Sequence, residues 1–408
     1  MVGHPARLPA GQPGQAAPLT PEQVRRLLTP AGRSAVGFAT ALDLSPAARL
    51  QAAEAVRGVA GPELGPLALE QALLKVRALA KHPAGDRLWW TREALEQASA
   101  YDVAVHRAQR FAGADRVLDL GCSVGGDLLP LAAVAPAVGV DLDEARLLLA
   151  RENAAVLGLD VALVRADVTR LEPTGAVFAD PARRAGGRRV FDPRSYTPRL
   201  DSVLGWLPRL SSLAVKVAPG IDYALVPPEI EVEIVSLRGE VKEAVLWGGL
   251  ARRGAARTAT LLPVGAVLTD EPVADPQVRP PGRFLLEPDG AVVRAHLVAQ
   301  VADRVGGWLL DSTIAYVSAD TAAPTSYGRW YEVLETLPFG LKPLRDRLRT
   351  YDAGPLVVKK RGTAVEPEVL RRQLKLTGST EVTVVLTRTA GRQTALIVRP
   401  FAGASATG

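Results

Sequence analysis

The chain has 408 residues, 48% of them hydrophobic, which is enough for roughly two to four domains with buried cores. Its single cysteine, Cys122, excludes an internal disulfide and fits a reducing cytoplasm, and the sequence has no run of about 18 apolar residues that would predict a transmembrane helix. The net charge is +6, and residues 331–408 alone carry that excess, with 13 Lys/Arg against 7 Asp/Glu, which indicates a polyanionic partner such as nucleic acid.

The first hundred residues read as a leader followed by helices. Residues 1–18 are rich in Pro, Gly and Ala and predict a disordered leader rather than a signal peptide. Thr20 and Pro21 are typical of a helix start, and helical spacing recurs over residues 47–58 and 67–81. We therefore expect a helical N-terminal domain over residues 19–100, in which the paired Trp89-Trp90 form a packing hinge more readily than a base-stacking platform.

Residues 116–127 read as a buried strand, a glycine turn and a helix start. Gly121 and Gly125 let the backbone approach a ligand closely, and the helix start offers unpaired N–H groups. Cys122 lies inside this turn, where a small packing residue is a better interpretation than a catalytic thiol. The pattern predicts a nucleoside-bearing ligand at the carboxyl edge of a parallel sheet.

Acidic residues end the strands that follow. Asp141 ends the second strand, 22 residues after Asp119, and is placed to accept hydrogen bonds from both ribose hydroxyls of a nucleoside. Asp167 ends the third strand, placed to accept from an adenine amino group, and Asp180-Pro181 ends the fourth. Core packing alone does not explain a polar residue at every one of these strand ends.

This order of motifs resembles class I S-adenosylmethionine-dependent methyltransferases, with Ser123 where the family usually has the middle glycine of its first motif. The dinucleotide-binding fingerprint of NAD enzymes fits less well. The stretch around Trp89 is also similar to the segment before the first motif in trimethylguanosine synthase-type RNA methyltransferases. The two resemblances imply S-adenosyl-L-methionine as cofactor and a set of cofactor-binding residues: Thr91, Asp119, Gly121, Cys122, Gly125, Gly126, Asp141, Leu142, Asp167, Val168 and Asp180.

The acceptor motif reads Asp180-Pro181-Ala182-Arg183, where related amino methyltransferases have a second proline and an aromatic residue. We expect Asp180, Pro181 and Arg183 to be the catalytic residues, and either Arg183, Phe191 or Tyr196 stacks on an acceptor base or no residue does. The nearby arginines form either a phosphate-contacting rim or a solvated loop, and the RNA-binding candidates among them are Arg183, Arg184, Arg188 and Arg189. No cysteine motif supports a covalent pyrimidine mechanism, and no metal site is expected.

The predicted methyltransferase domain spans residues 101–262, and beyond the fourth strand it contains a strand at 213–217 and a hairpin at 231–247. Residues 263–330 read as a linker and a connecting α+β segment, with a long helix from Phe284 to Val305. Residues 331–402 alternate strands and helices and predict a small, basic, ferredoxin-like α+β domain. The expected fold class is thus α/β, a Rossmann-like class I methyltransferase sheet between a helical and an α+β domain.

The whole order, over residues 20–402, is similar to a bacterial methyltransferase family with a THUMP-like C-terminal domain. That resemblance implies an RNA substrate, tRNA or rRNA, held in part by Lys359, Lys360 and Arg361. Two alternatives stay open: a methyltransferase for a small molecule or protein, and a cofactor-binding, RNA-associated protein without transfer activity. No membrane partner is expected, and the sequence does not indicate which RNA base is modified or an oligomeric state.

Overall fold

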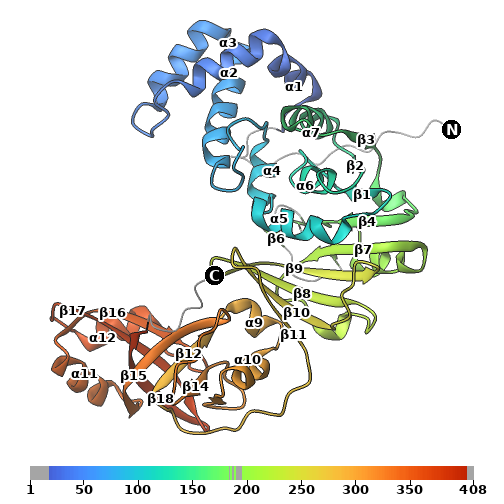
Figure 1. Ribbon diagram of the computed structural model, residues 1–408. Helices are drawn as coiled ribbons and strands as arrows, with labels where there is room; N and C mark the ends of the chain where they lie inside the picture. The colour runs from blue at the N-terminus through green and yellow to red at the C-terminus, as the bar shows by residue number, and fades with distance from the viewer. Residues whose placement is uncertain (1–17, 183, 186–187, 190–194, 402–408) are drawn as a thin grey trace. The chain divides into compact units, whose positions relative to one another are not determined.

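The computed structural model describes residues 18–182, 184–185, 188–189 and 195–401 (Figure 1). Nearly all of the predicted leader, residues 1–18, lies outside these ranges. The chain divides into two compact units, the first formed by Met1–Arg188 with Arg194–Ser211 and the second by Arg189–Pro193 with Ser212–Gly408. No helix in the described ranges combines the length and the apolar character that crossing a membrane requires.

The first unit begins with helices, as the sequence predicts: α1 Pro21–Leu28, α2 Pro30–Thr40, α3 Arg49–Ala78, α4 Arg92–Gln97 and α5 Tyr101–Ala108. Thr20 and Gln23 form a capping box at the start of α1. The sequence reading missed α2, because Pro30 and two glycines lower its helical propensity, and packing against α3 stabilises it instead. The two helices predicted at 47–58 and 67–81 are the two arms of α3, which Gly61 interrupts at φ 78°.

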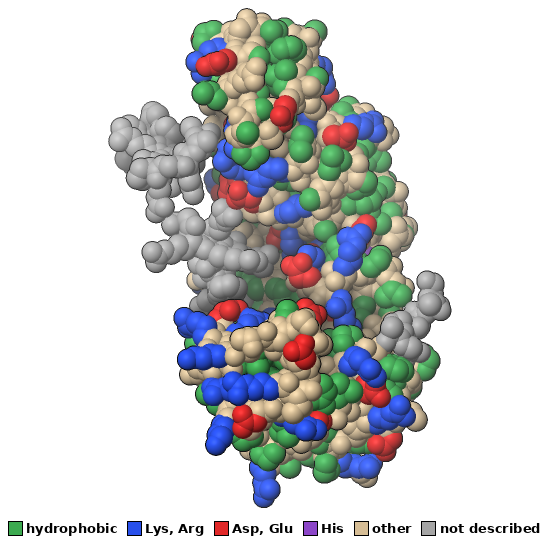
Figure 2. Space-filling model, turned by 90° about the vertical axis from the view of Figure 1, so that its left-hand side faces the viewer, with side chains coloured by type: hydrophobic (Ala, Val, Ile, Leu, Met, Phe, Trp, Pro, Cys, Tyr) green, Lys and Arg blue, Asp and Glu red, His purple; other side chains and the backbone are tan. Residues whose placement is uncertain are grey.

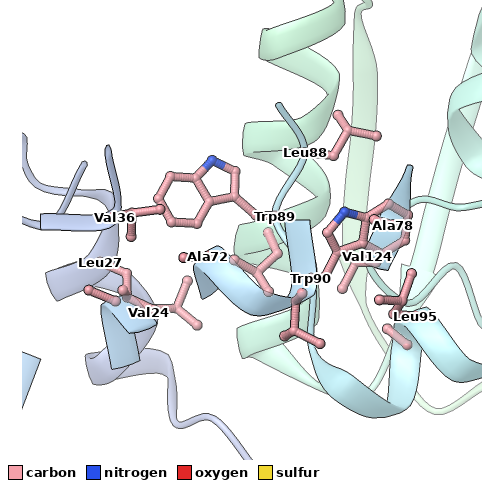
Figure 3. Packing of buried hydrophobic residues seen from close by; sticks show 14 of the residues in the cluster. Val24, Leu27, Val36, Ala72, Ala78, Leu88, Trp89, Trp90, Leu95 and Val124 are labelled. Atoms are coloured by element: carbon pink, nitrogen blue, oxygen red, sulfur yellow. The ribbon is translucent and has the colours of Figure 1, made fainter. Parts of the chain in front are cut away.

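The paired tryptophans belong to the core of this helical layer. Trp89 and Trp90 are almost fully buried, and in Figure 3 the ring of Trp89 lies on the side of Val36 while that of Trp90 lies on the side of Val124. The Trp90 indole donates to the Gly85 carbonyl at 3.1 Å, and the Lys75 ammonium lies 4.7 Å from the Trp89 ring centroid. The packing interpretation is therefore confirmed, and neither ring is available as a base-stacking platform.

Asn153 joins this cluster to the glycine turn at residues 121–125. Its side chain is buried, accepts from Trp89 N at 2.7 Å, and donates to the carbonyls of Trp89 at 3.0 Å and Val124 at 2.9 Å.

Asn153→Leu is expected to lower the free energy of unfolding by about 3 kcal/mol, because three buried backbone groups lose their partner. Urea unfolding followed by tryptophan fluorescence measures this; Arg151→Gln, an exposed change on the same helix, is the control, and equal midpoints would contradict the assignment.

The first unit also holds a parallel sheet of four strands in the order β4-β1-β2-β3. Helix α6, Leu128–Ala132, follows β1, and α7, Glu144–Leu157, connects β2 to β3. Asp143 caps α7 by accepting from Ala145 N and Arg146 N, and Gly158 ends it at φ 68°. The strands are β1 Val117–Leu120, β2 Ala137–Asp141, β3 Val161–Arg165 and β4 Gly175–Ala179, and the remaining elements are β5 Arg184–Ala185, β6 Arg188–Arg189 and α8 Leu200–Leu204.

In the second unit, the predicted hairpin is present and its strands are ordered β7-β9-β8. Two further strands, β10 and β11, extend this order and were not predicted from the sequence. Strand β10 pairs with β8 in parallel, and β11 pairs with β10 antiparallel. Glu231 and Glu233 of β8 are buried, and their carboxylates accept from Thr258 Oγ1 at 2.8 Å and Thr260 Oγ1 at 2.6 Å. The strands are β7 Leu210–Val217, β8 Glu231–Leu237, β9 Glu240–Gly249, β10 Arg257–Leu262 and β11 Ala266–Thr269.

The long helix predicted from Phe284 to Val305 is wrong. Residues Phe284–Pro288 form strand β12, which pairs antiparallel with β14, Val317–Ala319, and β15, Gly328–Pro338. An apolar Phe-Leu-Leu run suits either element, and here its two strand partners decide. The rest of the span forms two short helices, α9 Gly290–Arg294 and α10 Val298–Arg304, and strand β13, Trp308–Leu309, follows it.

The C-terminal region alternates strands and helices as expected, in the chain order β-α-β-α-β-β. Its strands belong to the same sheet as β12, in the order β12-β15-β18-β17-β16, and β16 and β17 are parallel. The α+β class is confirmed, although a ferredoxin-like domain has the chain order β-α-β-β-α-β. The elements are α11 Leu341–Thr350, β16 Ala353–Lys360, α12 Pro367–Leu374, β17 Thr380–Thr389 and β18 Arg392–Pro400.

Helices α11 and α12 cover one face of this sheet. Leu344 and Leu348 of α11, and Leu370 and Leu374 of α12, are buried against the strands at a spacing of one helical turn. The outer faces of the two helices carry four exposed cations, Lys342, Arg349, Arg372 and Lys375, whose side chains make no hydrogen bond or ion pair within the described ranges. Figure 2 shows Lys and Arg side chains gathered on the lower part of the visible face, the side on which Figure 1 places α11 and α12.

Candidate active site

A cavity of about 290 Å³ opens at the carboxyl ends of β1, β2 and β4 in the first unit. Four of its lining residues are aspartates and one is an arginine, Arg146, so the described wall is rich in negative charge. The lining residues are Ala94, Gln97, Ala98, Leu120, Gly121, Cys122, Ser123, Val124, Gly126, Asp127, Asp141, Leu142, Arg146, Ala166, Asp167, Val168, Thr169, Asp180, Ala182, Thr197 and Pro198. Eight of the predicted cofactor-binding residues are among them, all except Thr91, Asp119 and Gly125.

The turn after β1 owes its shape to three positive φ angles. Gly121 has φ 93°, Ser123 φ 51° and Gly125 φ 98°. Ser123 therefore adopts the left-handed conformation for which the family pattern usually supplies glycine. The Ser123 N–H donates to Asp141 Oδ2 at 2.9 Å, which ties the turn to the end of β2. Gly125 lies outside the cavity wall and packs against Leu129 instead.

Asp141 organises the centre of the wall. Its second carboxylate oxygen, Oδ1, accepts from Asp143 N at 2.9 Å, so both oxygens hold backbone N–H groups on opposite sides of the strand end. Asp141 is almost fully buried and still lines the cavity. The carboxylate is thus held in one orientation at the position that the sequence assigns to the ribose acid.

Beneath the turn, Asp119 is fully buried and its Oδ2 atom has no hydrogen-bond partner among the described residues. Burial, together with the charges of Asp127 and Asp180, raises the pKa of the Asp119 carboxyl well above its usual value, and Arg107 only partly opposes this. The buried Arg107 guanidinium pairs with Asp127 and lies 4.6 Å from the Phe178 ring centroid. An unsatisfied buried carboxyl group at this place favours a cationic or hydrogen-donating ligand.

The acceptor motif follows β4. Asp180 is partly buried and lines the cavity, Pro181 is buried, and Ala182 exchanges backbone hydrogen bonds with Thr197 at 2.8 and 3.1 Å. This bridge brings Thr197 and Pro198 into the wall, which the sequence reading did not anticipate. Tyr196, one of three candidates for stacking on a base, is buried instead. Arg183 and Phe191 lie outside the described residues, so the assignment of Arg183 stays a prediction.

The opposite end of the wall is formed by the end of β3. Asp167 Oδ1 accepts from Thr169 N at 2.9 Å and from Thr169 Oγ1 at 2.6 Å, and these hydrogen bonds lower the pKa of the Asp167 carboxyl. Val168 and the exposed Leu142 flank it. The ionised carboxylate beside two apolar side chains suits an aromatic base with an amino group, as the sequence predicts for this position.

Other predicted site residues lie elsewhere. Thr91 is the N-cap of α4 and accepts from Ala94 N at 3.1 Å, and the cavity is reached instead by Ala94 and Gln97 of α4 and by its C-cap, Ala98. For the arginine loop, the structure gives only the backbone of Arg184 in β5 and of Arg188 and Arg189 in β6, and nothing of their side chains. Their predicted contact with RNA phosphates is therefore not tested.

The predicted cluster at the end of β16 is engaged in contacts within the second unit. Lys359 pairs with Glu287 at 2.6 Å, and Lys360 pairs with Glu366 at 2.6 Å. Arg361 donates to the Ala315 carbonyl and lies 4.8 Å from the Tyr316 ring centroid. An RNA phosphate would have to compete with these partners, whereas the exposed cations on α11 and α12 have none to displace within the described chain.

Two further observations concern chemistry at the site. Burial raises the pKa of the Cys122 thiol far above its usual value, so the thiol stays protonated and is a poor nucleophile. Among the described residues, no group of three or more His, Cys, Asp or Glu side chains could hold a metal ion. Cys122 is buried and contributes its surface to the cavity wall, in agreement with its packing interpretation.

These residues fit the cofactor that the motifs imply. S-adenosylmethionine carries a sulfonium and an ammonium group, and the cavity offers carboxylates with the buried, unpartnered oxygen of Asp119 beneath them. Asp141 would accept from the ribose hydroxyls and Asp167 from the adenine amino group. At Gly121 the backbone can come close to the ligand, because the space beside its Cα atom is open. A Cβ atom added at Gly121 would have the Asp180 carbonyl oxygen, 3.8 Å away, as its nearest neighbour.

Comparisons with known proteins agree with this geometry. Family models match three parts of the chain: a methyltransferase domain over residues 117–179, a THUMP domain-like region over residues 328–400, and a domain of unknown function over residues 20–78. The first of these covers strands β1 to β4 and most of the residues that line the cavity, and the second covers the C-terminal domain with its two basic helices.

Relatives extend the match to most of the chain. In two strains of Mycobacterium tuberculosis, CDC 1551 and H37Rv, an uncharacterised S-adenosylmethionine-dependent methyltransferase is 43% identical over 352 residues, covering 82% of this chain and 97% of the relative. A crystal structure of a protein assigned as a methyltransferase from Porphyromonas gingivalis W83 has the same fold, with a TM-score of 0.69, 22% identity and 94% coverage of both chains. The predicted fold class is thereby confirmed, and this chain belongs to the S-adenosylmethionine-dependent methyltransferases.

Proposed function

We propose that this S-adenosylmethionine-dependent methyltransferase modifies a base in tRNA or rRNA, which the C-terminal domain helps to hold. The observation that carries the proposal is the outer face of α11 and α12, where four exposed cations have no partner within the described residues. The match of residues 328–400 to the THUMP domain-like family supports it, and so does the location of the whole net charge in residues 331–408. Clustered, unpaired cations on one domain favour a phosphate backbone.

In the catalytic step, the cofactor supplies a methyl group bound to a sulfonium, and the enzyme has to align an acceptor in line with it. Asp180 lines the cavity just after the end of β4, and the buried Pro181 follows it; the Asp180 carboxylate and the Pro181 carbonyl would accept hydrogen bonds from an acceptor amine and orient its lone pair. Ala182 leaves no aromatic side chain at the motif itself. We therefore assign positioning of the acceptor to Asp180 and Pro181.

Charge neutralisation on α11 and α12 tests the RNA proposal. Arg349→Gln with Arg372→Gln is expected to weaken binding of total tRNA about tenfold and to reduce the salt slope by about 1.5, because two phosphate contacts are lost. The control is Arg253→Gln with Arg329→Gln, which removes the same charge from exposed positions in the same unit. Equal loss in both variants, or no tRNA binding by the wild-type protein, would contradict the proposal.

The buried Asp119 predicts a proton linked to cofactor binding. Burial raises the pKa of this carboxyl, and the cationic cofactor favours its ionised form, so binding is expected to lower that pKa and to release protons wherever the free carboxyl is protonated. We expect cofactor affinity to rise with pH until pH exceeds this raised pKa, and Asp119→Asn to lose that dependence. Calorimetric titrations in buffers of different ionisation enthalpy measure how many protons are released when the cofactor binds. Subtracting the number for Asp119→Asn from that for the wild-type protein removes the protons that the ligand itself releases. Identical pH profiles would refute the role of Asp119.

A further inference from the structure

A second cavity lies away from the active-site wall, in the N-terminal helical layer. It has a volume of about 330 Å³ and is bordered by both arms of α3 and by the start of α4. The residues that line it are Arg49, Ala53, Arg57, Gly65, Pro66, Leu69, Glu70, Leu73, Leu74, Arg77 and Arg92. We call this cavity the α3 groove; most of it falls within residues 20–78, which match a domain of unknown function.

The groove exists because α3 folds back on itself. Gly61 adopts φ 78° and ψ 174° inside the helix, and Pro62 starts the second arm. At Gly65 the two arms come so close that a Cβ atom would lie 2.9 Å from the Cα atom of Arg57. Only glycine allows this approach without a shift of the backbone, so the sequence fixes the distance between the arms and with it the shape of the groove.

The chemistry of the groove combines cations at its rim with an apolar floor. Arg49 and Arg57 lie two turns apart on the first arm, with Ala53 between them, and Arg77 lies two turns beyond Leu69 on the second. Those three arginines are exposed, and their side chains make no hydrogen bond or ion pair with any part of the chain that the structure describes. Arg92 alone pairs with an acid of the groove, Glu70, at 3.1 Å.

We infer that the α3 groove binds an unpaired nucleotide of the RNA substrate, an inference that rests on the proposed function. Three unpaired guanidinium groups complement phosphates and can stack on a base, while Leu69, Leu73 and Pro66 offer the face of the base an apolar surface. An acidic peptide would use the rim but would gain little from the floor. The helical domain thus adds a second RNA-contacting surface to that of α11 and α12.

Photo-crosslinking of the full-length protein to total tRNA containing 4-thiouridine tests this inference. We expect crosslinked peptides from residues 49–79, and Arg57→Gln with Arg77→Gln should abolish them and weaken tRNA binding about tenfold. Arg116→Gln with Arg151→Gln removes equal charge from exposed positions of the same unit and should change binding less than twofold. Leu73→Gln should lower the crosslinking yield while leaving the salt slope unchanged, which separates base contacts from phosphate contacts.

The outcomes separate this inference from the proposed function. If the wild-type protein binds no tRNA, both fail. If it binds tRNA, but without crosslinks to α3 and with equal affinity in the two arginine pairs, the groove inference is overturned while the proposed function stands. Competition with polyglutamate gives a third outcome. If polyglutamate displaces tRNA from the wild-type protein but not from the double variant Arg57→Gln with Arg77→Gln, the groove prefers an acidic peptide and the inference is overturned.

Discussion

Asp180→Asn is expected to lower the rate constant of methyl transfer about 10³-fold while changing the dissociation constant of S-adenosylmethionine by less than about fivefold. The carboxylate lies at the end of β4, on the side of the cavity where the acceptor motif bridges to Thr197. Asparagine keeps the size of the side chain but presents one acceptor atom in place of two, so the acceptor amine is no longer held in line. Single-turnover transfer and calorimetry measure the two constants separately.

Asp167→Asn is the matched control, because it makes the same change at the opposite end of the same cavity. It should weaken cofactor binding about tenfold and leave the rate constant at saturating cofactor within about threefold, since Asp167 is assigned to the adenine side. The two variants are therefore expected to have different defects: Asp180→Asn in methyl transfer and Asp167→Asn in cofactor binding. Two variants with the same defect would show that the acceptor and cofactor ends have been misassigned.

Asp141→Ala is expected to weaken S-adenosylmethionine binding about 100-fold. The variant loses the acceptor for the ribose hydroxyls, and it also releases the N–H groups of Ser123 and Asp143 that the carboxylate holds at 2.9 Å. Ser123 has φ 51°, so the turn loses the hydrogen bond that keeps this residue in a disfavoured conformation. Calorimetric titration with the cofactor and with S-adenosylhomocysteine measures the loss.

A neighbouring aspartate provides the control for that variant. Asp143 caps α7 and does not line the cavity, so Asp143→Ala should cost about 1 kcal/mol of stability and leave the cofactor dissociation constant nearly unchanged. Comparable loss of binding in both variants would mean that the end of β2 acts through its fold alone. Full binding by Asp141→Ala would remove Asp141 from the cofactor site.

The cavity wall could be predicted from sequence where its residues follow strands. Asp141, Asp167 and Asp180 each end or follow a parallel strand, and the carboxyl ends of such strands meet at one edge of a sheet. Chain order alone therefore brings together side chains that are up to 39 residues apart. The left-handed turn was also readable, although Ser123 occupies a position that the family pattern gives to glycine.

The parts that sequence reading missed reach the wall from other elements. Arg146 comes from the first turn of α7, Gln97 from α4, and Thr197 through its bridge to Ala182. Each depends on how a helix or loop packs over the strand ends, which no local pattern records. Arg107 shows the same limit, since its ion pair with Asp127 and its position over Phe178 join segments far apart in the sequence.

The basic C-terminal domain shows what a run of charges can conceal. Lys359, Lys360 and Arg361 attract attention as neighbours in the sequence, yet each is held by contacts within the second unit. Arg349 and Arg372 lie on different helices and come to one exposed face only because α11 and α12 pack against the same side of the sheet. Burial and pairing, which decide whether a cation is available to a phosphate, become visible only in the structure.

Transfer of labelled methyl groups to RNA from a strain that lacks the gene is the most direct test of function. We expect the purified protein to methylate a tRNA or rRNA fraction with close to one methyl group per molecule, and nucleoside analysis to find one modified base. RNA from the parent strain, already methylated, should accept little label, and Asp180→Asn should transfer it about 10³-fold more slowly than the wild-type protein. If the protein binds S-adenosylmethionine but RNA from the deletion strain accepts no methyl group, the enzyme does not act on that RNA.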